Sequence, residues 1–138
     1  MTKSIQILSG AEGIKQAYKE ALIEKALDIV CPSENYDSIL GGFFEKEYAP
    51  QLYSQVQTRE ILPDNQENRN YAKSKDEKKN TVRFMKGESS ESDMILSETK
   101  AILISYNPAH PFALVVRDQE LVRSFKNQFE VLWQALAE

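Results

Sequence analysis

A chain of 138 residues, 41% hydrophobic and 28% charged, has the size and composition of one globular domain, so we expect a single domain over residues 1–138. Its net charge of -4 argues against direct contact with nucleic acid, because proteins that bind phosphate backbones are usually basic. No apolar run approaches the ~18 residues that a membrane span needs, and the only cysteine, Cys31, has no partner for an internal disulfide. We therefore expect a cytoplasmic protein without membrane contact.

The first part of the chain alternates strands with helices. Short apolar runs predict strands at residues 4–8, 26–31 and 56–62, and helical periodicity fills the intervals between them. Ser9 is the expected N-cap of the first helix, with Glu12 three residues later as its partner in a capping box. Strands separated by helices usually pair in parallel, because each crossover returns the chain to the same end of the sheet. We therefore expect parallel pairing among the early strands.

The second helical segment has a wide apolar face that contains two glycines. The apolar residues of this face recur at helical spacing: Ile39, Leu40, Phe43, Phe44 and Tyr48. Gly41 and Gly42 each cost about 1 kcal/mol against alanine inside a helix, so we expect them to permit close packing. Pro50 should kink or end the helix. The polar stretch at 64–80 is expected to be a solvated helix or loop.

The second part of the chain is rich in strands. We predict strands at 81–85 and 112–116, and a hairpin whose arms are residues 93–97 and 101–105. Asp118 is the expected N-cap of a last helix that runs to the end of the chain. An apolar stripe continues along that helix: Leu121, Val122, Phe125, Phe129, Leu132, Trp133 and Leu136. The whole order predicts the α/β class, with a mixed β-sheet flanked by helices.

Motifs for phosphate, cofactor or metal binding are not found in the sequence. "GAEG" and "GG" do not match the glycine-rich loops that cradle phosphates, and one histidine and one cysteine, far apart, give no zinc spacing. We therefore expect no cofactor and no bound metal. A dyad of Cys31 and His110 is conceivable, because both follow predicted strands. The alternative is stronger, since a cysteine that ends an apolar strand is usually a core residue, and the prolines around His110 indicate an exposed turn.

Two stretches resemble a known family. "SGAEGIKQAYKEAL" is similar to the opening of the C-terminal effector region of TrmB-like transcriptional regulators, where "EGI" leads the first helix. The end, "AILISYNPAHPFALVVRDQELVRSFKNQFEVLW", is similar to the closing part of that region, with Phe129, Leu132 and Trp133 at its last-helix phenylalanine and Leu-Trp pair. The resemblance implies a phospholipase D-like half as the fold. These regulators carry a winged helix-turn-helix ahead of the region, and we expect no DNA-binding domain in this chain.

The enzymes related to that region carry H-x-K-x4-D, whose histidine attacks phosphorus while a partner histidine protonates the leaving group. By position the motif falls near "SDMILSETK", which contains no histidine. His110 comes later and is followed by Pro-Phe-Ala, so the lysine is missing as well. Asn107 stands where those enzymes have an asparagine after the motif, and alone it can position a ligand but not attack one. We expect that the protein is not an enzyme and has no phosphodiesterase activity.

A ligand pocket is expected beyond the carboxyl ends of the parallel strands, where loops diverge. Polar groups with an aromatic wall suit a small polar ligand such as a sugar. The candidate ligand-binding residues follow the predicted strands or lie within them: Cys31, Ser33, Tyr36, Arg59, Arg83, Tyr106, Asn107 and His110. The two arginines would add contacts to an anion, but their places in mid-strand are equally compatible with a solvated face.

Three functions remain open at this level. The favoured one is a non-catalytic effector-sensing or dimerisation domain of the regulator type. The alternatives are a protein-interaction module without a ligand and a degenerate phospholipase D-like hydrolase. The resemblance also implies a homodimer, and the aromatic residues of the first two helical segments offer a surface for it: Tyr18, Phe43, Phe44 and Tyr48.

Overall fold

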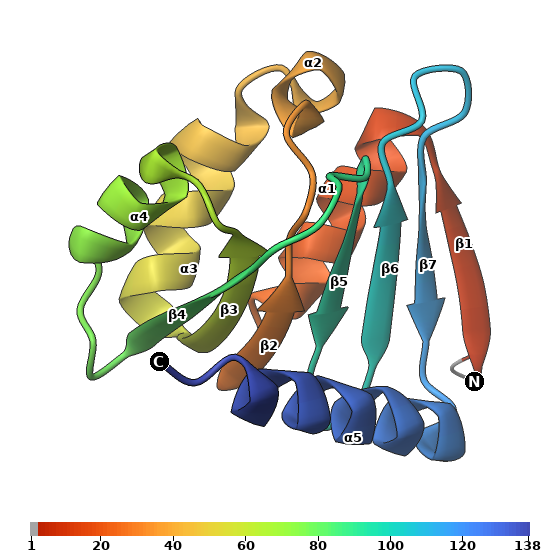
Figure 1. The fold of residues 1–138 in the computed structure, drawn as a ribbon. Helices are drawn as coiled ribbons and strands as arrows, with labels where there is room; N and C mark the ends of the chain where they lie inside the picture. The colour runs from red at the N-terminus through yellow and green to blue at the C-terminus, as the bar shows by residue number, and fades with distance from the viewer. Residues whose placement is uncertain (1–2) are drawn as a thin grey trace.

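A seven-stranded mixed sheet forms the centre of the protein, for which the computed structural model describes residues 3–138. The strands are β1 (Ile5–Ser9), β2 (Ala26–Val30), β3 (Gln57–Pro63), β4 (Asn80–Met85), β5 (Ser92–Leu96), β6 (Ala101–Ser105) and β7 (Phe112–Val116). Their order across the sheet is β1-β7-β6-β5-β2-β3-β4 (Figure 1). β2, β3 and β4 pair in parallel, and the remaining neighbours are antiparallel. The predicted α/β class with a mixed sheet is therefore confirmed.

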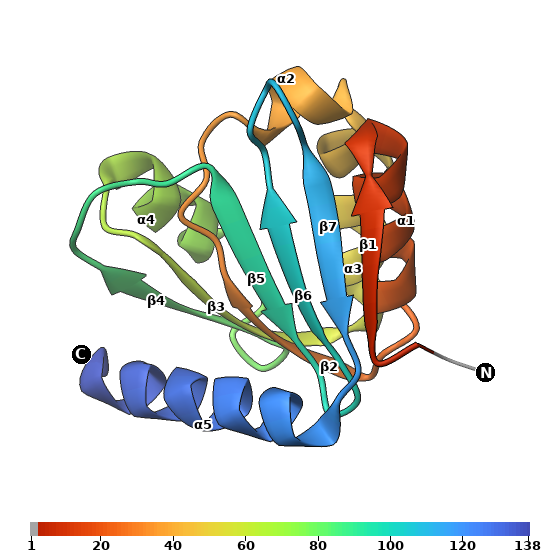
Figure 2. The same cartoon turned by 90° about the vertical axis from the view of Figure 1, so that its right-hand side faces the viewer.

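Helices cover both faces of this sheet. They are α1 (Gly10–Ala21), α2 (Tyr36–Leu40), the π-helical η1 (Phe44–Tyr48), α3 (Ala49–Gln55), α4 (Gln66–Lys73) and α5 (Gln119–Ala135). α1, η1 and α3 pack on one face, whereas α5 crosses the other (Figure 2). Among the described residues, no helix is long and apolar enough to cross a membrane.

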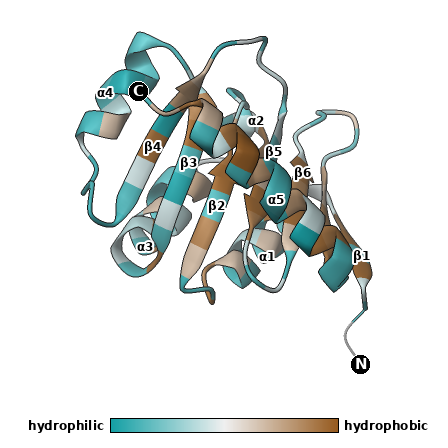
Figure 3. Ribbon diagram, turned by 60° about the horizontal axis from the view of Figure 1, so that its bottom comes forward, coloured by the Kyte–Doolittle hydropathy of each residue, from teal (hydrophilic) through white to brown (hydrophobic). Residues whose placement is uncertain are grey.

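Two apolar cores lie on the two faces of the sheet, and hydrophobic residues are concentrated in the strands and along α5 (Figure 3). The core under α1 and α3 buries Tyr18, Phe43 and Tyr48 within the chain itself. Phe44 is half-buried against the same core, so these four residues offer little surface for pairing two chains. The homodimer stays a prediction that light scattering would test. The core under α5 is built around Phe129 and Trp133, whose stacked rings have centroids 5.7 Å apart.

The two predicted helix starts have different outcomes. Asp118 is confirmed as an N-cap, because its carboxylate accepts a hydrogen bond from the backbone N–H of Leu121 at 3.1 Å. The capping box at Ser9 is wrong, since Ser9 ends β1 and its side chain makes no cap hydrogen bond with α1. Instead, α1 turns directly out of the strand, which places Gly13 against the backbone of Leu8. A Cβ at Gly13 would lie 2.4 Å from the carbonyl carbon of Leu8.

The segment predicted as one helix with internal glycines is broken at those glycines. α2 ends at Gly41, which has a left-handed φ of 59°, and Gly42 follows with a φ of 84°. The two glycines therefore reverse the chain and do not serve close helix packing, because positive φ is a conformation that residues with a Cβ rarely adopt. Pro50 does not end the helix either. It lies in the first turn of α3, which continues without a break from the π-helical η1.

The position of β1 differs from the parallel arrangement expected for the early strands. β1 lies at the far edge of the sheet and pairs antiparallel with β7, with Ile7 opposite Leu114. Along β1, exposed residues alternate with half-buried ones, which suits an edge strand better than a central one. The predicted hairpin is confirmed by the antiparallel pairing of β5 with β6. The polar stretch at 64–80 contains α4, which buries no residue fully.

Candidate functional site

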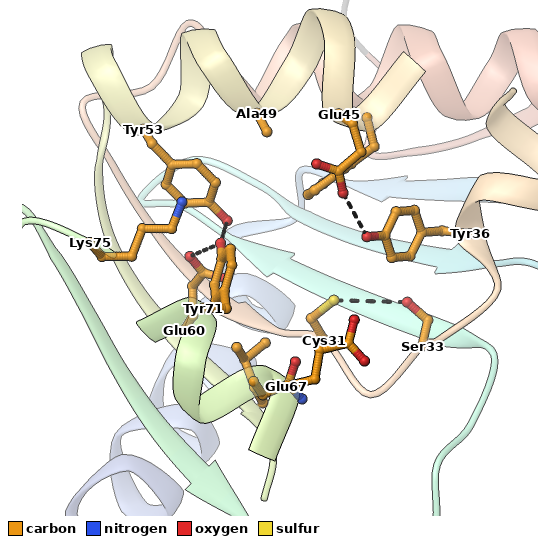
Figure 4. A pocket seen from close by; sticks show the side chains of 13 residues that line it. Cys31, Ser33, Tyr36, Glu45, Ala49, Tyr53, Glu60, Glu67, Tyr71 and Lys75 are labelled. Carbon is orange, nitrogen blue, oxygen red and sulfur yellow. Dashed lines mark hydrogen bonds between the residues drawn. The ribbon is translucent and has the colours of Figure 1, made fainter. Parts of the chain in front are cut away.

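An open cavity of about 220 Å³ lies beyond the carboxyl end of β2, between α3 and α4 (Figure 4). We call it the outer cavity. The segment after β2 contributes Cys31 and Ser33, α2 contributes Tyr36, and β3 contributes Glu60. The rest of its lining comes from Leu62 of β3, from η1, α3 and α4, and from Lys75, which follows α4. Its place matches the expectation for α/β sheets, because ligands gather beyond the carboxyl ends of parallel strands.

Three of the predicted ligand-binding residues meet in the outer cavity. The Sγ of Cys31 lies 3.8 Å from the Oγ of Ser33, and that hydroxyl donates to a carboxylate oxygen of Asp93 at 2.7 Å. The hydroxyl of Tyr36 donates to Glu45 at 3.0 Å. Burial raises the pKa of the Cys31 thiol well above its usual value, and the charge of Asp93 acts in the same direction. The thiol therefore stays protonated at neutral pH and is a poor nucleophile.

Tyr106, which follows β6, lines neither of the cavities described in this section but reaches the same region through Asp93. Its hydroxyl donates to the second oxygen of Asp93 at 3.0 Å and is hydrogen-bonded to the hydroxyl of Tyr18. Asp93 lies on β5, which pairs antiparallel with β2 on one side and with β6 on the other. β2 and β6 therefore run in the same direction, and the one buried carboxyl of Asp93 links the regions at their carboxyl ends. Burial raises the pKa of Asp93, while its hydrogen bonds from Ser33 and Tyr106 oppose that shift.

A smaller inner cavity of about 20 Å³ lies beside the outer one. Its lining includes Glu60, Asp93 and Tyr48. The side chains that line both cavities are Cys31, Phe44, Tyr53 and Glu60. The hydroxyl of Tyr48 is buried and has no hydrogen-bond partner among the described residues. The inner cavity therefore places an unsatisfied hydroxyl near two buried carboxyl groups.

Two other predicted residues lie outside both cavities. Asn107 and His110 are exposed in the turn between β6 and β7. The Asn107 side chain accepts a hydrogen bond from the backbone N–H of Ala109 at 3.1 Å. The ring of His110 lies against Phe112, with centroids 5.8 Å apart. Within residues 3–138, neither of the two is part of either cavity lining.

The two predicted arginines lie on the opposite face of the sheet, under α5. Arg59 donates to Asp28 at 2.8 Å and to Glu130 at 3.1 Å, and its guanidinium lies over the ring of Phe129. The guanidinium of Arg83 lies 4.2 Å from the centroid of a Trp133 ring. Alternation along β3 explains this placement, because the side chain of Arg59 points to α5 while that of the next residue, Glu60, points to the cavities.

A cluster around Glu60 is part of the cavity that sequence reasoning did not identify. Glu60 is 3% exposed and accepts a hydrogen bond from the hydroxyl of Tyr71 at 3.4 Å. The hydroxyls of Tyr71 and Tyr53 are hydrogen-bonded to each other (Figure 4). The Nζ of Lys75 lies 3.4 Å from the ring centroid of Tyr53 and 4.3 Å from that of Tyr71. Two tyrosine rings, both in the hydrogen-bonded group that includes a buried carboxyl, thus lie against an ammonium group.

Only a weak sequence signal marks this cluster. Glu60 is a carboxylate inside the strand "TREIL", and Asp93 is one inside "SDMIL". Strands covered by helices on both faces seldom contain unpaired carboxylates, because burial of a charge is costly. Two such residues in apolar strands therefore indicate a buried polar site, but the positions of the tyrosines around Glu60 depend on helix packing that the sequence does not specify.

Burial of Glu60 predicts an effect of pH on stability. Burial raises the pKa of Glu60 from 4.5 to about 6, against the opposing hydrogen bonds of the two tyrosines and the charge of Lys75. The stabilisation from the protonated carboxyl is complete below pH 4.5 and is lost as pH rises through 6. The natural chain should lose this stabilisation between pH 4 and pH 7.5, whereas Glu60→Gln should not. The free energy of unfolding of Glu60→Gln, relative to that of the natural chain, should therefore rise by about 2 kcal/mol from pH 4 to pH 7.5.

Urea unfolding at the two pH values measures this difference. The exposed Glu88→Gln is the matched control and should show no such gain. If Glu60→Gln and the natural chain differ by the same free energy of unfolding at both pH values, the carboxyl of Glu60 is not desolvated.

Comparisons with known proteins place this fold. The chain matches no family model and no curated protein. Among solved structures, it is similar to TrmBL2, an archaeal chromatin protein, with a TM-score of 0.62 and 17% identity over 97% of this chain and 54% of that one. The chain therefore spans about half the length of TrmBL2.

Two further solved structures are similar over nearly their whole length. NucT from Helicobacter pylori has a TM-score of 0.59 and 8% identity, over 94% of this chain and 95% of that one. Nuc from Salmonella typhimurium, a phospholipase D family member, has a TM-score of 0.57 and 12% identity, over 95% and 94% of the two chains. The fold implied by the sequence resemblance is confirmed: the chain has the α/β fold that TrmBL2 shares with these phospholipase D-like proteins.

Proposed function

We propose that this chain is a non-catalytic, effector-sensing domain that binds a small polar ligand in the outer cavity. The observation that carries the proposal is the cavity itself, which opens where the parallel strands end and presents hydroxyl, carboxyl and amide groups between aromatic walls. Cys31, Ser33 and Tyr36 would contact the ligand directly. Tyr106 acts on the site through Asp93, which holds Ser33 in place. The likeness of the fold to TrmBL2 is compatible with a regulatory role.

A ligand screen combined with a blocked cavity tests this proposal. A panel of small polar metabolites, including sugars, should contain members that raise the melting temperature of the full chain. At about 100 times the Kd, the rise should be roughly 8–10 °C. Ala49 lines the outer cavity, so Ala49→Trp should fill the space and abolish the rise.

The matched control is Ala135→Trp, which adds the same side chain at an exposed position on α5. It should leave the rise intact. If no compound raises the melting temperature, or if every rise persists in Ala49→Trp, the proposal is rejected and a protein-interaction module is favoured.

We also expect no phosphodiesterase activity. Hydrolysis through a phosphorylated histidine needs a positioned nucleophile and a second acid group. Within the described residues, the imidazole of His110 forms no hydrogen bond with a carboxylate or with Cys31, and it lies outside both cavities. Purified protein should not hydrolyse bis(p-nitrophenyl) phosphate above the buffer rate. Turnover that is lost in His110→Ala would instead support the degenerate hydrolase.

A further inference from the structure

The charges that line the two cavities are mostly negative. The outer cavity contains the carboxyl groups of Glu45, Glu60 and Glu67, and the inner cavity adds Asp93. The positively charged side chain in their lining is Lys75. Four carboxyl groups against one ammonium attract a cation and repel an anion.

These carboxyl groups do not form a metal site. Among residues 3–138, no three histidine, cysteine, aspartate or glutamate side chains gather closely enough to hold a metal ion. Aromatic rings line the same cavity, from Tyr36, Phe44, Tyr53 and Tyr71. Rings attract organic cations through their negatively charged faces. The lining therefore suits an organic cation better than a metal ion.

Lys75 shows how this lining holds an ammonium group. Its Nζ lies over the rings of Tyr53 and Tyr71, and both hydroxyls belong to the hydrogen-bonded group that ends at Glu60 (Figure 4). Burial lowers the pKa of Lys75, while the charge of Glu60 opposes the shift. Lys75 lies two residues after the end of α4, outside the secondary structure, and its side chain lines the outer cavity. The chain thus supplies its own ammonium to the place where a ligand ammonium would be recognised.

Hydrogen-bonding capacity points to the same place. Glu60 lines both cavities, and the hydrogen bond that its carboxyl accepts from Tyr71 is long, at 3.4 Å. The hydroxyl of Tyr48 in the inner cavity has no hydrogen-bond partner among the described residues. An ammonium group has three donors and no acceptor. A donor-rich head at the junction of the two cavities would add hydrogen bonds to Glu60 and supply a partner for the Tyr48 hydroxyl.

We propose that the ligand of the outer cavity is a small organic amine, whose ammonium binds Glu60 between the rings of Tyr53 and Tyr71. The proposal rests on the proposed ligand-binding function and specifies the ligand class. Lys75 acts as an internal competitor that the ligand displaces. Its release on binding would change the segment after α4, which gives a sensing domain a structural response.

Binding should depend on pH through Glu60. The ionisable groups that face it are Tyr53 from α3, Tyr71 from α4, Lys75, Asp93 from β5, Tyr48 from η1 and Cys31 after β2. The tyrosines and the thiol are neutral from pH 5 to pH 7.5, because burial raises their pKa values. Protonation of Glu60 near pH 6 removes the charge that attracts the amine, so affinity should fall as the pH is lowered.

Matched pairs of probes test the proposal by isothermal titration calorimetry on the full chain. Putrescine is compared with 1,4-butanediol, and ethanolamine with ethylene glycol, because each pair differs only in its ammonium groups. At pH 7.5 we expect at least one amine to bind tenfold or more tightly than its diol. Glu60→Gln should abolish this preference, and the amine should bind several-fold more weakly at pH 5 than at pH 7.5.

The variant Lys75→Met decides the role of the internal ammonium. Removal of a competitor should strengthen amine binding several-fold, whereas Ala49→Trp should abolish it and the exposed Glu88→Gln should leave it unchanged. Weaker amine binding in Lys75→Met, equal affinity for amines and diols, or no binding of either amine would overturn the inference. If diols or sugars bind and Ala49→Trp abolishes their binding, the proposed ligand-binding function is still supported. Failure of the amine inference can therefore be distinguished from failure of the proposed function.

Discussion

Replacement of Phe129 by alanine should lower the free energy of unfolding by about 3–5 kcal/mol, the usual range for loss of a fully buried aromatic ring. Phe129 is 1% exposed and stacks on Trp133 at the centre of the core under α5. Its ring also supports the guanidinium of Arg59, with the charged centre 5.1 Å from the centroid. The substitution would therefore leave a cavity and loosen the ion pair between Arg59 and Asp28 at the same time.

Chemical denaturation monitored by circular dichroism measures this loss. Val131→Ala on the same helix is the control, because Val131 is 73% exposed and its truncation leaves no internal void. A loss below about 1.5 kcal/mol for Phe129→Ala would mean that α5 is not packed on the sheet as described, since that is less than burial of the ring alone contributes.

Gly13→Ala should be as damaging as a core truncation, although it adds only one methyl group. The new Cβ would lie 2.4 Å from the carbonyl carbon and 2.5 Å from the carbonyl oxygen of Leu8, and both are backbone atoms. Overpacking usually costs 1–3 kcal/mol, and a clash with backbone has no side chain that can move aside, so we expect about 3 kcal/mol or more. The φ of Gly13 is not positive, so the loss would come from contact and not from backbone strain.

Thermal unfolding compares this variant with Gln16→Ala, an exposed change in the same helix that should be neutral or slightly stabilising. If Gly13→Ala melts at the temperature of the natural chain, the close crossing of α1 over β1 would be disproved.

The sequence predicted elements better than it predicted their ends and neighbours. Apolar runs located the strands because burial on a sheet face demands them, and Asp118 could be recognised because an N-cap acts within one turn. The pair Gly41 and Gly42 was misread, because a helical apolar pattern continues across the chain reversal that they make. The edge position of β1 depends on pairing with β7, a contact that no local pattern encodes.

Within the site, sequence reasoning found the residues that follow strands and missed those that helices bring in. Cys31 and Ser33 come directly after β2, and Tyr36 begins the helix that follows, so their place agrees with a rule about strand ends. Glu60 and Tyr71 meet through the packing of α4 beside β3, which depends on tertiary contacts. Arg59 was predicted as a ligand-binding residue but lies on the face under α5. Side chains alternate between the two faces along a strand, and the sequence alone does not determine which face Arg59 occupies.

The pairing of β1 with β7 also bears on how the chain folds. Ile5 pairs with Val116, so this ladder forms only after most of the chain between them has been ordered. Contacts of such large sequence separation carry a high loop-closure entropy and slow the search for the native state. The parallel strands β2, β3 and β4, and the β5–β6 hairpin, have much shorter connections. The N-terminal strand should therefore dock late, onto a sheet that is already assembled.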